Sequence, residues 1–397
     1  MGRAQNRAIR LRMSLRTDCV GMQPWHNALH SRNSCQFPQS ALCSGSPLFG
    51  TAPGSVLSYR CTMPTSNPLS VLPTLEADLV RVEQALLDSV ASDLAMLNES
   101  AAHLAKAGGK RVRPGFAIAA AATNHTEVRA ADQDVIMGGV AVELVHLGSL
   151  YHDDVMDEAT TRRSVPAANQ RWGNVVAILT GDFLLAQSSI IAAALGTEVA
   201  ALLGETIAEL ADGQIRELQD TDNFDRTAED YYAAISGKTA SLLACACRIG
   251  GIAGHLDRPQ IDALTEFGHS YGMAFQIVDD ILDVVATSEQ LGKPAGNDIL
   301  EGNFTLPVLR ALRGENGDQL RSLIEAGLTP ETRDQALVLV RTSPGIADAV
   351  DAARSWADKA AGTLSNLTES PGATALRAAA DHLVDRARAP LGAQGAD

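Results

Sequence analysis

The chain has 397 residues, of which 46% are hydrophobic and 20% are charged, and its formal net charge at pH 7 is −15. This hydrophobic fraction is enough for a large core, so the composition excludes a chain that is disordered throughout. An acidic chain lacks the basic surface that nucleic-acid phosphates require, so we expect no nucleic-acid partner.

The first 62 residues differ in composition from the rest of the chain. They contain seven Arg, no Lys and a single acid, Asp18, and they show no helical period. Three explanations are open: a start codon assigned too early, with translation beginning at Met63; an organellar transit peptide, which is Arg- and Ser-rich and poor in acids; or a disordered basic arm. In each case we expect the folded domain to span residues 63–397.

Localisation follows from composition and from the cysteines. The body prefers Arg to Lys and is rich in Ala and Gly, which favours a bacterial protein. Cys245 and Cys247 lie in an apolar helical run, where buried thiols are common. We expect a reducing cytoplasm, and an organelle only if residues 1–62 are a genuine transit peptide. No apolar stretch reaches roughly 18 residues without a charged or strongly polar break, so we expect no transmembrane segment.

Helical patterns follow one another from Leu69 onward, separated by short breaks at Gly, Pro, Asp or Asn. The first has Leu75, Leu79, Val82 and Leu86 on one face, and a long apolar-faced helix is expected over residues 130–157. Further helices are expected over residues 169–194, 198–220, 227–252, 258–287, 301–313, 318–326, 331–341, 346–367 and 371–389. No alternation is long enough to build a sheet, so the sequence predicts an all-α fold.

One acidic pattern, D-D-x-x-D, occurs twice on these helices. The first copy is Asp153, Asp154 and Asp157, and the second is Asp279, Asp280 and Asp283. Three carboxylates within about one helical turn repel one another unless a cation neutralises them. Oxygen-only sites suit Mg²⁺, which binds through a few carboxylates and the phosphates of a substrate. We therefore expect the two motifs to face each other across a cavity and to bind a diphosphate through Mg²⁺.

Basic residues lie close to both motifs. Arg162 and Arg163 follow the first motif, Lys110 and Arg113 follow the Gly108–Gly109 pair, Lys238 with Thr239 precedes the second motif, and Lys293 follows it. The three lysines are rare residues here, because the chain has only five, and each lies near a Gly. An ordinary ion pair remains the alternative for any one of these residues, but together they suit a diphosphate ligand.

These motifs resemble those of the trans-isoprenyl diphosphate synthases, in that family's order and over residues 70–390. The resemblance also includes residues 108–114, His146, residues 181–184, 237–239 and 275–283, Gly292 to Pro294 and Gly296 to Asp298. It implies an isoprenoid-synthase-like bundle of about a dozen helices around a deep central cavity, usually as a homodimer.

The resemblance also implies an activity and its residues. The enzyme would use Mg²⁺ to condense isopentenyl diphosphate onto an allylic diphosphate, either farnesyl or geranylgeranyl diphosphate. Asp153, Asp157 and Asp279 would bind the metal ions, with Asp154, Asp280 and Asp283 in the same network. Arg162, Lys238, Thr239, Gln276 and Lys293 would hold the allylic diphosphate. Lys110, Arg113, His146 and Arg163 would hold isopentenyl diphosphate, although a histidine on an apolar helix can also be a plain core residue.

Two features bear on the subtype. Asn303 stands where many family members have a Lys, which removes a cation expected near the allylic diphosphate. Gly148 and Ser149, one turn before Asp153, are small, whereas a bulky aromatic there ends elongation early in this family. We therefore predict a hepta- to nonaprenyl product, as in quinone side chains. If Met137 closed the channel higher up, the product would be geranylgeranyl diphosphate.

Other readings are weaker but open. The chain could be the catalytic subunit of a two-component synthase. A terpene cyclase is less favoured because aromatic residues make up only 4% of the chain and the second D-D-x-x-D is complete. A non-catalytic partner subunit is less favoured because both motifs are intact. Peripheral contact with a membrane during product release is also left open.

Overall fold

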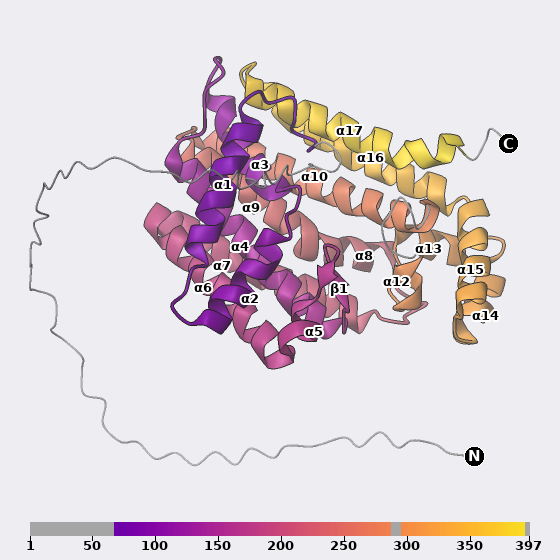
Figure 1. Cartoon of the computed structure of the whole chain (residues 1–397). Helices are drawn as coiled ribbons and strands as arrows, with labels where there is room; N and C mark the ends of the chain where they lie inside the picture. The colour runs from indigo at the N-terminus through magenta and orange to yellow at the C-terminus, as the bar shows by residue number, and fades with distance from the viewer. Residues whose placement is uncertain (1–66, 287–294, 394–397) are drawn as a thin grey trace, which may run out of the picture. The chain divides into compact units, whose positions relative to one another are not determined.

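The computed structural model describes residues 67–286 and 295–393. The predictions on residues 1–62, on a start at Met63 and on Lys293 lie outside these residues. The prediction of an all-α fold is confirmed: the described residues form helices and one short hairpin (Figure 1).

The elements fall in the following order. They are α1 Leu75–Ser89, α2 Ala95–Lys106, α3 Val112–Ala121, η1 Ala122–Asn124, α4 Gln133–Met156, β1 Thr161–Arg162, β2 Val165–Pro166, α5 Ala168–Trp172, α6 Asn174–Leu195, α7 Thr197–Gln219, α8 Ala228–Ile235, η2 Ser236–Ala240, α9 Ser241–Ala253, α10 Arg258–Val285, α12 Asn297–Leu300, α13 Leu306–Leu312, α14 Gly317–Glu325, α15 Pro330–Thr342, α16 Gly345–Thr363, η3 Leu364–Asn366 and α17 Pro371–Ala393.

Three expected helices are interrupted, and the cause is local in each. The helix over 169–194 is split into α5 and α6 at Gly173, whose φ of 83° lies in the region that glycine alone adopts readily. The helix over 227–252 contains a π-helical turn, η2, between α8 and α9. The helix expected over 301–313 begins only at Leu306, as α13, because residues 301–305 form a turn and a loop that ends at the cap residue Thr305.

The described core has two parts. The first cluster of buried apolar side chains draws on α1 to α7, α9, the first half of α10, the end of α16 and α17, and it includes Leu147 and Tyr151 of α4. The second draws on the later half of α10 and on α13 to α16, and it includes Ile277 and Ile281. Because α10 contributes to both clusters, it connects the part that carries the first acidic motif to the part that carries the second.

Close helix crossings depend on glycines at two places. A Cβ on Gly250 of α9 would lie 2.2 Å from the carbonyl oxygen of Ala117 in α3. A Cβ on Gly213 of α7 would lie 2.4 Å from the backbone nitrogen of Lys238 in η2. Such distances are far inside van der Waals contact, so only glycine lets these backbones approach. The second crossing holds η2 directly against α7.

Two described helices, α4 and α6, would be long and apolar enough to cross a bilayer if only length and composition counted. The most apolar window of α4 is 72% buried within the body, whereas that of α6 is 33% buried. Core helices of folded domains also meet this criterion, and α4 is one of them. The expected absence of a transmembrane segment therefore stays a prediction, and the exposed side of α6 has to be explained.

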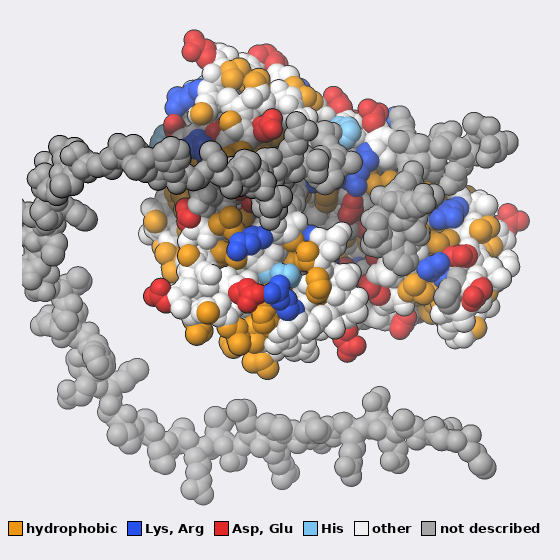
Figure 2. Space-filling model, in the orientation of Figure 1, with side chains coloured by type: hydrophobic (Ala, Val, Ile, Leu, Met, Phe, Trp, Pro, Cys, Tyr) orange, Lys and Arg blue, Asp and Glu red, His pale blue; other side chains and the backbone are white. Residues whose placement is uncertain are grey.

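Acidic and basic side chains are interspersed over the face drawn in Figure 2. Among the described residues on that face, neither sign forms one wide field. This mixture does not resemble the basic stripe of a nucleic-acid-binding surface.

Candidate active site

The first acidic motif ends α4, and its three carboxylates divide between inside and outside. Asp154 is fully buried, and its Oδ1 accepts a hydrogen bond from Arg162 Nε at 2.7 Å. Asp153 is half-buried and Asp157 is exposed. Residues at i and i+4 share one face of a helix, so Asp153 and Asp157 point the same way while Asp154 points into the body. Asp154 therefore faces away from any ligand of the motif and instead fixes the position of Arg162.

The second motif, in the later half of α10, divides in the same manner. Asp280 is 4% exposed, and its carboxylate accepts hydrogen bonds from Tyr231 Oη at 2.5 Å and from Gln276 Nε2 at 2.8 Å. Asp283 is also buried, and the backbone nitrogen of Asp298 lies 3.4 Å from its Oδ2. Asp279 is half exposed, with Arg386 of α17 3.4 Å away. In each motif the second aspartate is therefore buried; Asp157 and Asp279 are exposed, and Asp153 is half-buried.

The π-helical turn η2 lies between the two motifs. Lys238 forms an ion pair with Glu217 of α7 and lies within the electrostatic influence of Asp153 and Asp157. The next residue, Thr239, donates a hydrogen bond to Gln276 Oε1 at 2.8 Å, and Gln276 in turn donates to Asp280. Consecutive residues of one turn thus join both motifs. Single π-helical turns inside α-helices are frequent at functional sites.

Burial and charge act in opposite directions at Lys238. Burial lowers the pKa of its ammonium group, but Glu217, Asp153 and Asp157 outweigh that effect, and the net pKa is raised. The side chain is therefore a fixed positive charge at neutral pH, beside two carboxylates of the first motif. A phosphate group drawn between them would meet a cation that is already in place.

A second basic group, made up of Arg113, Arg163 and His146, lies around Glu143 of α4. The hairpin turn between β1 and β2 consists of Arg163 and Ser164, with φ of 52° and 63°. Such values suit a two-residue hairpin turn but are unfavourable for residues other than Gly, Asn and Asp, and strain of this kind gathers at functional sites. The turn places the Arg163 guanidinium 3.9 Å from Glu143, with hydrogen bonds to the carbonyls of Leu104 and Gly108.

This basic group has spare capacity for an anion. Burial lowers the pKa of Arg113 to about 10, so the side chain stays charged at neutral pH, and its buried Nε has no hydrogen-bond partner among the described residues. Burial and the charges of Arg113 and Arg163 hold the pKa of His146 well below its usual range. A neutral imidazole beside two guanidinium groups can donate one hydrogen bond to a phosphate without adding to the repulsion.

Other predicted residues lie at different depths. The exposed Lys110 lies within electrostatic range of Asp279 and Arg386, on the side of the second motif. Gly148 does not leave open space, because a Cβ there would lie 3.1 Å from the carbonyl oxygen of Gly181 in α6. Ser149 is half-buried and donates to the carbonyl of His146 at 2.9 Å. Their role in chain length stays a prediction.

The carboxylates fit Mg²⁺ only in combination with a ligand. Within residues 67–286 and 295–393, no three His, Cys, Asp or Glu side chains are grouped so that they could hold a metal ion alone. Mg²⁺ characteristically binds one or two carboxylates and completes its shell with water and substrate phosphates. Asp153, Asp157 and Asp279, the open positions of the two motifs, are the residues that would hold it.

The affinity for Mg²⁺ should depend on pH. Burial, with the neighbouring Asp157, raises the pKa of Asp153 to about 6, against the opposing charge of Lys238. In the metal-free protein the folded state therefore binds more protons than the unfolded state between about pH 4 and 6, so the contribution of Asp153 to stability falls as pH rises.

Mg²⁺ binds only the ionised carboxylate. We therefore expect the rise in Tm that Mg²⁺ and inorganic diphosphate produce to become larger from pH 5.5 to 8. The Asp153→Asn variant should lose most of this growth; an unchanged pH dependence in that variant would contradict the assignment.

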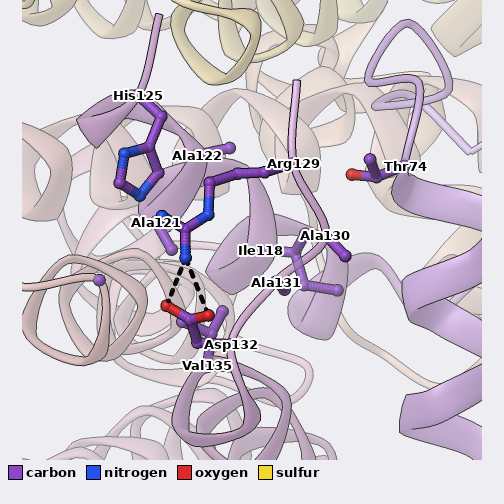
Figure 3. Close-up of a pocket in the computed structure, with 11 residues that line it drawn as sticks. Thr74, Ile118, Ala121, Ala122, His125, Arg129, Ala130, Ala131, Asp132 and Val135 are labelled. Carbon is purple, nitrogen blue, oxygen red and sulfur yellow. Dashed lines mark hydrogen bonds and ion pairs between the residues drawn. The ribbon is translucent and has the colours of Figure 1, made fainter. Parts of the chain in front are cut away.

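The small pocket in Figure 3 is separate from these residues. Its volume is about 20 Å³, room for about one water, and Arg129 and Asp132 form an ion pair at its edge. None of the predicted site residues lines it. The deep central cavity expected between the two acidic motifs stays a prediction.

Several residues of the site are missing from the sequence prediction. Glu217, Tyr231 and Arg386 contact Lys238, Asp280 and Asp279 respectively, and they come from three other helices. No spacing in the sequence connects them to the motifs. Arg226 is also missing from the prediction. Asn303 stands where many family members have a Lys, but a positive charge is still close by, because the guanidinium of Arg226 donates a hydrogen bond to Asn303 Oδ1 at 2.9 Å.

This arrangement defines a class of enzyme: a helical protein that brings two aspartate motifs to one lysine-bearing turn, beside a second basic group. A family model described as polyprenyl synthetase matches residues 94–339. Nonaprenyl diphosphate synthase of Mycobacterium tuberculosis is 40% identical over 315 residues, which cover 79% of this chain and 93% of that protein. Heptaprenyl diphosphate synthase component 2 of Geobacillus stearothermophilus is 40% identical over 72% of this chain and 87% of that protein.

Solved structures agree. Geranylgeranyl pyrophosphate synthase from Corynebacterium glutamicum, complexed with calcium and isoprenyl diphosphate, superposes with a TM-score of 0.69 and is 40% identical, covering 80% of this chain and 97% of that one. The chain belongs to the polyprenyl synthetase family. It is a trans-prenyltransferase, a metal-dependent prenyl synthase that acts on isopentenyl diphosphate and an allylic diphosphate.

Proposed function

We propose that the enzyme uses Mg²⁺ to extend farnesyl or geranylgeranyl diphosphate with isopentenyl diphosphate until a hepta- to nonaprenyl diphosphate, the precursor of a menaquinone side chain, is made. The observation that carries the proposal is the turn of Lys238 and Thr239, which joins the first motif to Gln276 and Asp280. The names of the two relatives, nonaprenyl and heptaprenyl diphosphate synthase, support the product length.

Each basic group has its own task in this reaction. Lys238, with Arg162 and Gln276, holds the allylic diphosphate beside Asp153 and Asp157, where Mg²⁺, when bound, neutralises the charge of the leaving group. Arg113, Arg163 and His146 hold isopentenyl diphosphate. Holding both substrates by their phosphates brings the allylic carbon to the double bond, and the apolar surroundings keep water away. The departing diphosphate can accept the proton, so no separate side-chain base is required.

A single assay tests the activity and the product length. The full chain and a variant that begins at Met63 are incubated with farnesyl diphosphate, isopentenyl diphosphate and Mg²⁺, and the products are separated and weighed by mass spectrometry. Hepta- to nonaprenyl products from both proteins would support the proposed product and a domain that starts near Met63. Without product from the full chain alone, the enzyme would need a second component, as the name of the Geobacillus relative indicates for that protein.

Geranylgeranyl diphosphate is the second candidate product. One observation favours it: the space beside Gly148 is filled by Gly181 and Leu185 of α6, so a channel cannot pass through that point. The similar structure from Corynebacterium glutamicum is that of a geranylgeranyl pyrophosphate synthase. In the assay above, accumulation of geranylgeranyl diphosphate with excess isopentenyl diphosphate would identify this product.

We also infer that the enzyme is a homodimer through the outer side of α6. Val175, Leu179 and Ile190 on that helix are 71%, 59% and 63% exposed, more apolar surface on one helix than a monomer usually leaves in water. The middle of the same helix carries the exposed Asp182, which a bilayer would not accept, so a second copy suits the surface better than lipid. A dimer there would also hold α6 against α4 behind the first motif.

The dimer can be tested by charge insertion. The double substitution Leu179→Asp and Ile190→Asp should convert a dimer to a monomer in light scattering, because buried unpaired carboxylates are costly. Val338→Asp, on an exposed aliphatic residue of α15, is the matched control and should leave the mass unchanged. A dimer that persists in the double variant would place the interface elsewhere.

A cytoplasmic location in a bacterial cell completes the proposal. The described thiols, Cys245 and Cys247, are buried and free, which suits a reducing compartment. Cell fractionation followed by immunoblotting would detect the protein in the soluble fraction; recovery only from membranes after a salt wash would contradict this location.

A further inference from the structure

A buried guanidinium lies behind the second acidic motif. Arg226, in the loop between α7 and α8, is 1% exposed and is among the largest fully buried side chains of the described chain. Its Nε lies 3.4 Å from Oδ2 of Asp220 but makes no hydrogen bond in the described structure. A charge buried with so loose a counter-ion is costly to folding, so its retention requires another reason.

Arg226 ties three segments together. Its Nη1 donates to Oδ1 of Asn303 at 2.9 Å and to the carbonyl oxygen of Phe304 at 3.0 Å, which fixes the loop between α12 and α13. Its Cζ lies 5.6 Å from the centre of the Tyr231 ring, a cation–π distance, which fixes α8. Its own carbonyl accepts a hydrogen bond at 2.6 Å from Arg313, the residue that follows α13.

Tyr231 leads from this cation to the motif. The tyrosine is 1% exposed, so its ring has little freedom, and its hydroxyl donates to Oδ2 of Asp280 at 2.5 Å. Gln276 occupies the other oxygen of Asp280, which leaves that carboxylate in one orientation. Asp280 is adjacent to Asp279, the exposed carboxylate of the same motif. The order of contacts is therefore Asn303, Arg226, Tyr231, Asp280.

We propose that Arg226 is a positioning residue for the second acidic motif: acting through Tyr231, it fixes Asp280 and thereby the direction in which the motif presents Asp279 to a metal-bound diphosphate. The inference rests on the proposed Mg²⁺ site. Groups one shell away from metal ligands set the orientation of those ligands, and their loss typically weakens metal binding or activity by roughly 10- to 100-fold. In this protein the loop with Asn303 serves to hold the guanidinium.

The test is a double-mutant cycle of Arg226→Gln and Tyr231→Phe, with two readouts. The first is the Mg²⁺ concentration for half-maximal activity, and the second is the rise in Tm caused by Mg²⁺ with inorganic diphosphate in the full-length protein. Each single variant should need roughly tenfold more Mg²⁺ and show a smaller rise in Tm. If Arg226 acts through Tyr231, the double variant should be no worse than the poorer single variant. Arg248→Gln, which removes an ion pair with Asp262 elsewhere on the surface, is the matched control and should leave both readouts unchanged.

The outcomes separate this inference from the proposed function. Additive effects in the cycle, or a wild-type Mg²⁺ requirement in Arg226→Gln, would overturn the positioning role and leave the metal site intact. If Mg²⁺ with inorganic diphosphate does not raise the Tm of the wild-type protein, the metal site itself fails and the inference fails with it. If Arg226→Gln does not fold, Arg226→Lys replaces it in the cycle, because lysine keeps the charge but cannot bond Asn303 and Phe304 while stacking on Tyr231.

Discussion

Replacing Asp153 with Asn is expected to lower the rate of product formation by about 10³-fold with saturating Mg²⁺. The side chain keeps its size, but it can no longer help to neutralise the diphosphate as it leaves, and a single lost electrostatic contact of this kind costs roughly 10²- to 10³-fold. Asp153 is the half-buried carboxylate that faces Lys238, so the loss also leaves that lysine with fewer negative charges around it. Steady-state kinetics with isopentenyl diphosphate and farnesyl diphosphate would measure the effect.

The control for this prediction is Asp262→Asn. Asp262 is another aspartate on a helix, paired with Arg248 and largely exposed, and it lies outside both motifs. Its replacement should change neither kcat nor the Mg²⁺ requirement. Turnover in Asp153→Asn at more than about a tenth of the wild-type rate would remove Asp153 from the proposed metal site.

Replacing Ser149 with Phe is expected to shift the product from hepta- or nonaprenyl to geranylgeranyl diphosphate or shorter. The half-buried Ser149 lies one helical turn before Asp153, so an aromatic ring there would fill the space just beyond the first motif. Only the length of the bound chain should change, because the phosphate-binding residues are untouched. Mass spectrometry of the products under excess isopentenyl diphosphate would show the shift.

Gly148→Phe should behave differently, although the sequence places both residues at the same turn. A Cβ at Gly148 would already lie 3.1 Å from the carbonyl oxygen of Gly181 and 3.2 Å from Leu185. We expect the larger side chain to push α6 away and to lower the free energy of unfolding by about 1–3 kcal/mol or more.

The control for Ser149→Phe is Ser322→Phe. Ser322 is an exposed serine that also donates a hydrogen bond to a helix carbonyl. Unchanged products in Ser149→Phe would remove that residue from the chain-length role.

The sequence predicted the helices of the fold well because their apolar residues recur at helical spacing. Its errors lie at local irregularities: Gly173 separates α5 from α6, and the π-helical turn η2 interrupts the helix expected over 227–252. A hairpin of two-residue strands is too short to leave an alternating pattern, although it carries Arg162 and Arg163. The π-helical turn and the hairpin both lie beside the site, where special backbone geometry is concentrated.

The repeated D-D-x-x-D pattern and the lysines beside glycine were sufficient, with the family resemblance, to indicate a metal-assisted prenyl transfer, since chemistry of this kind requires particular side chains at particular spacings. The tertiary structure alone decided which carboxylates are open and which are buried, because that depends on how α4 and α10 pack and not on their order in the chain. It also decided that Glu217, Tyr231, Arg226 and Arg386 belong beside the motifs. Contacts between distant segments depend on helix packing, and a periodic pattern within one helix carries no information about them.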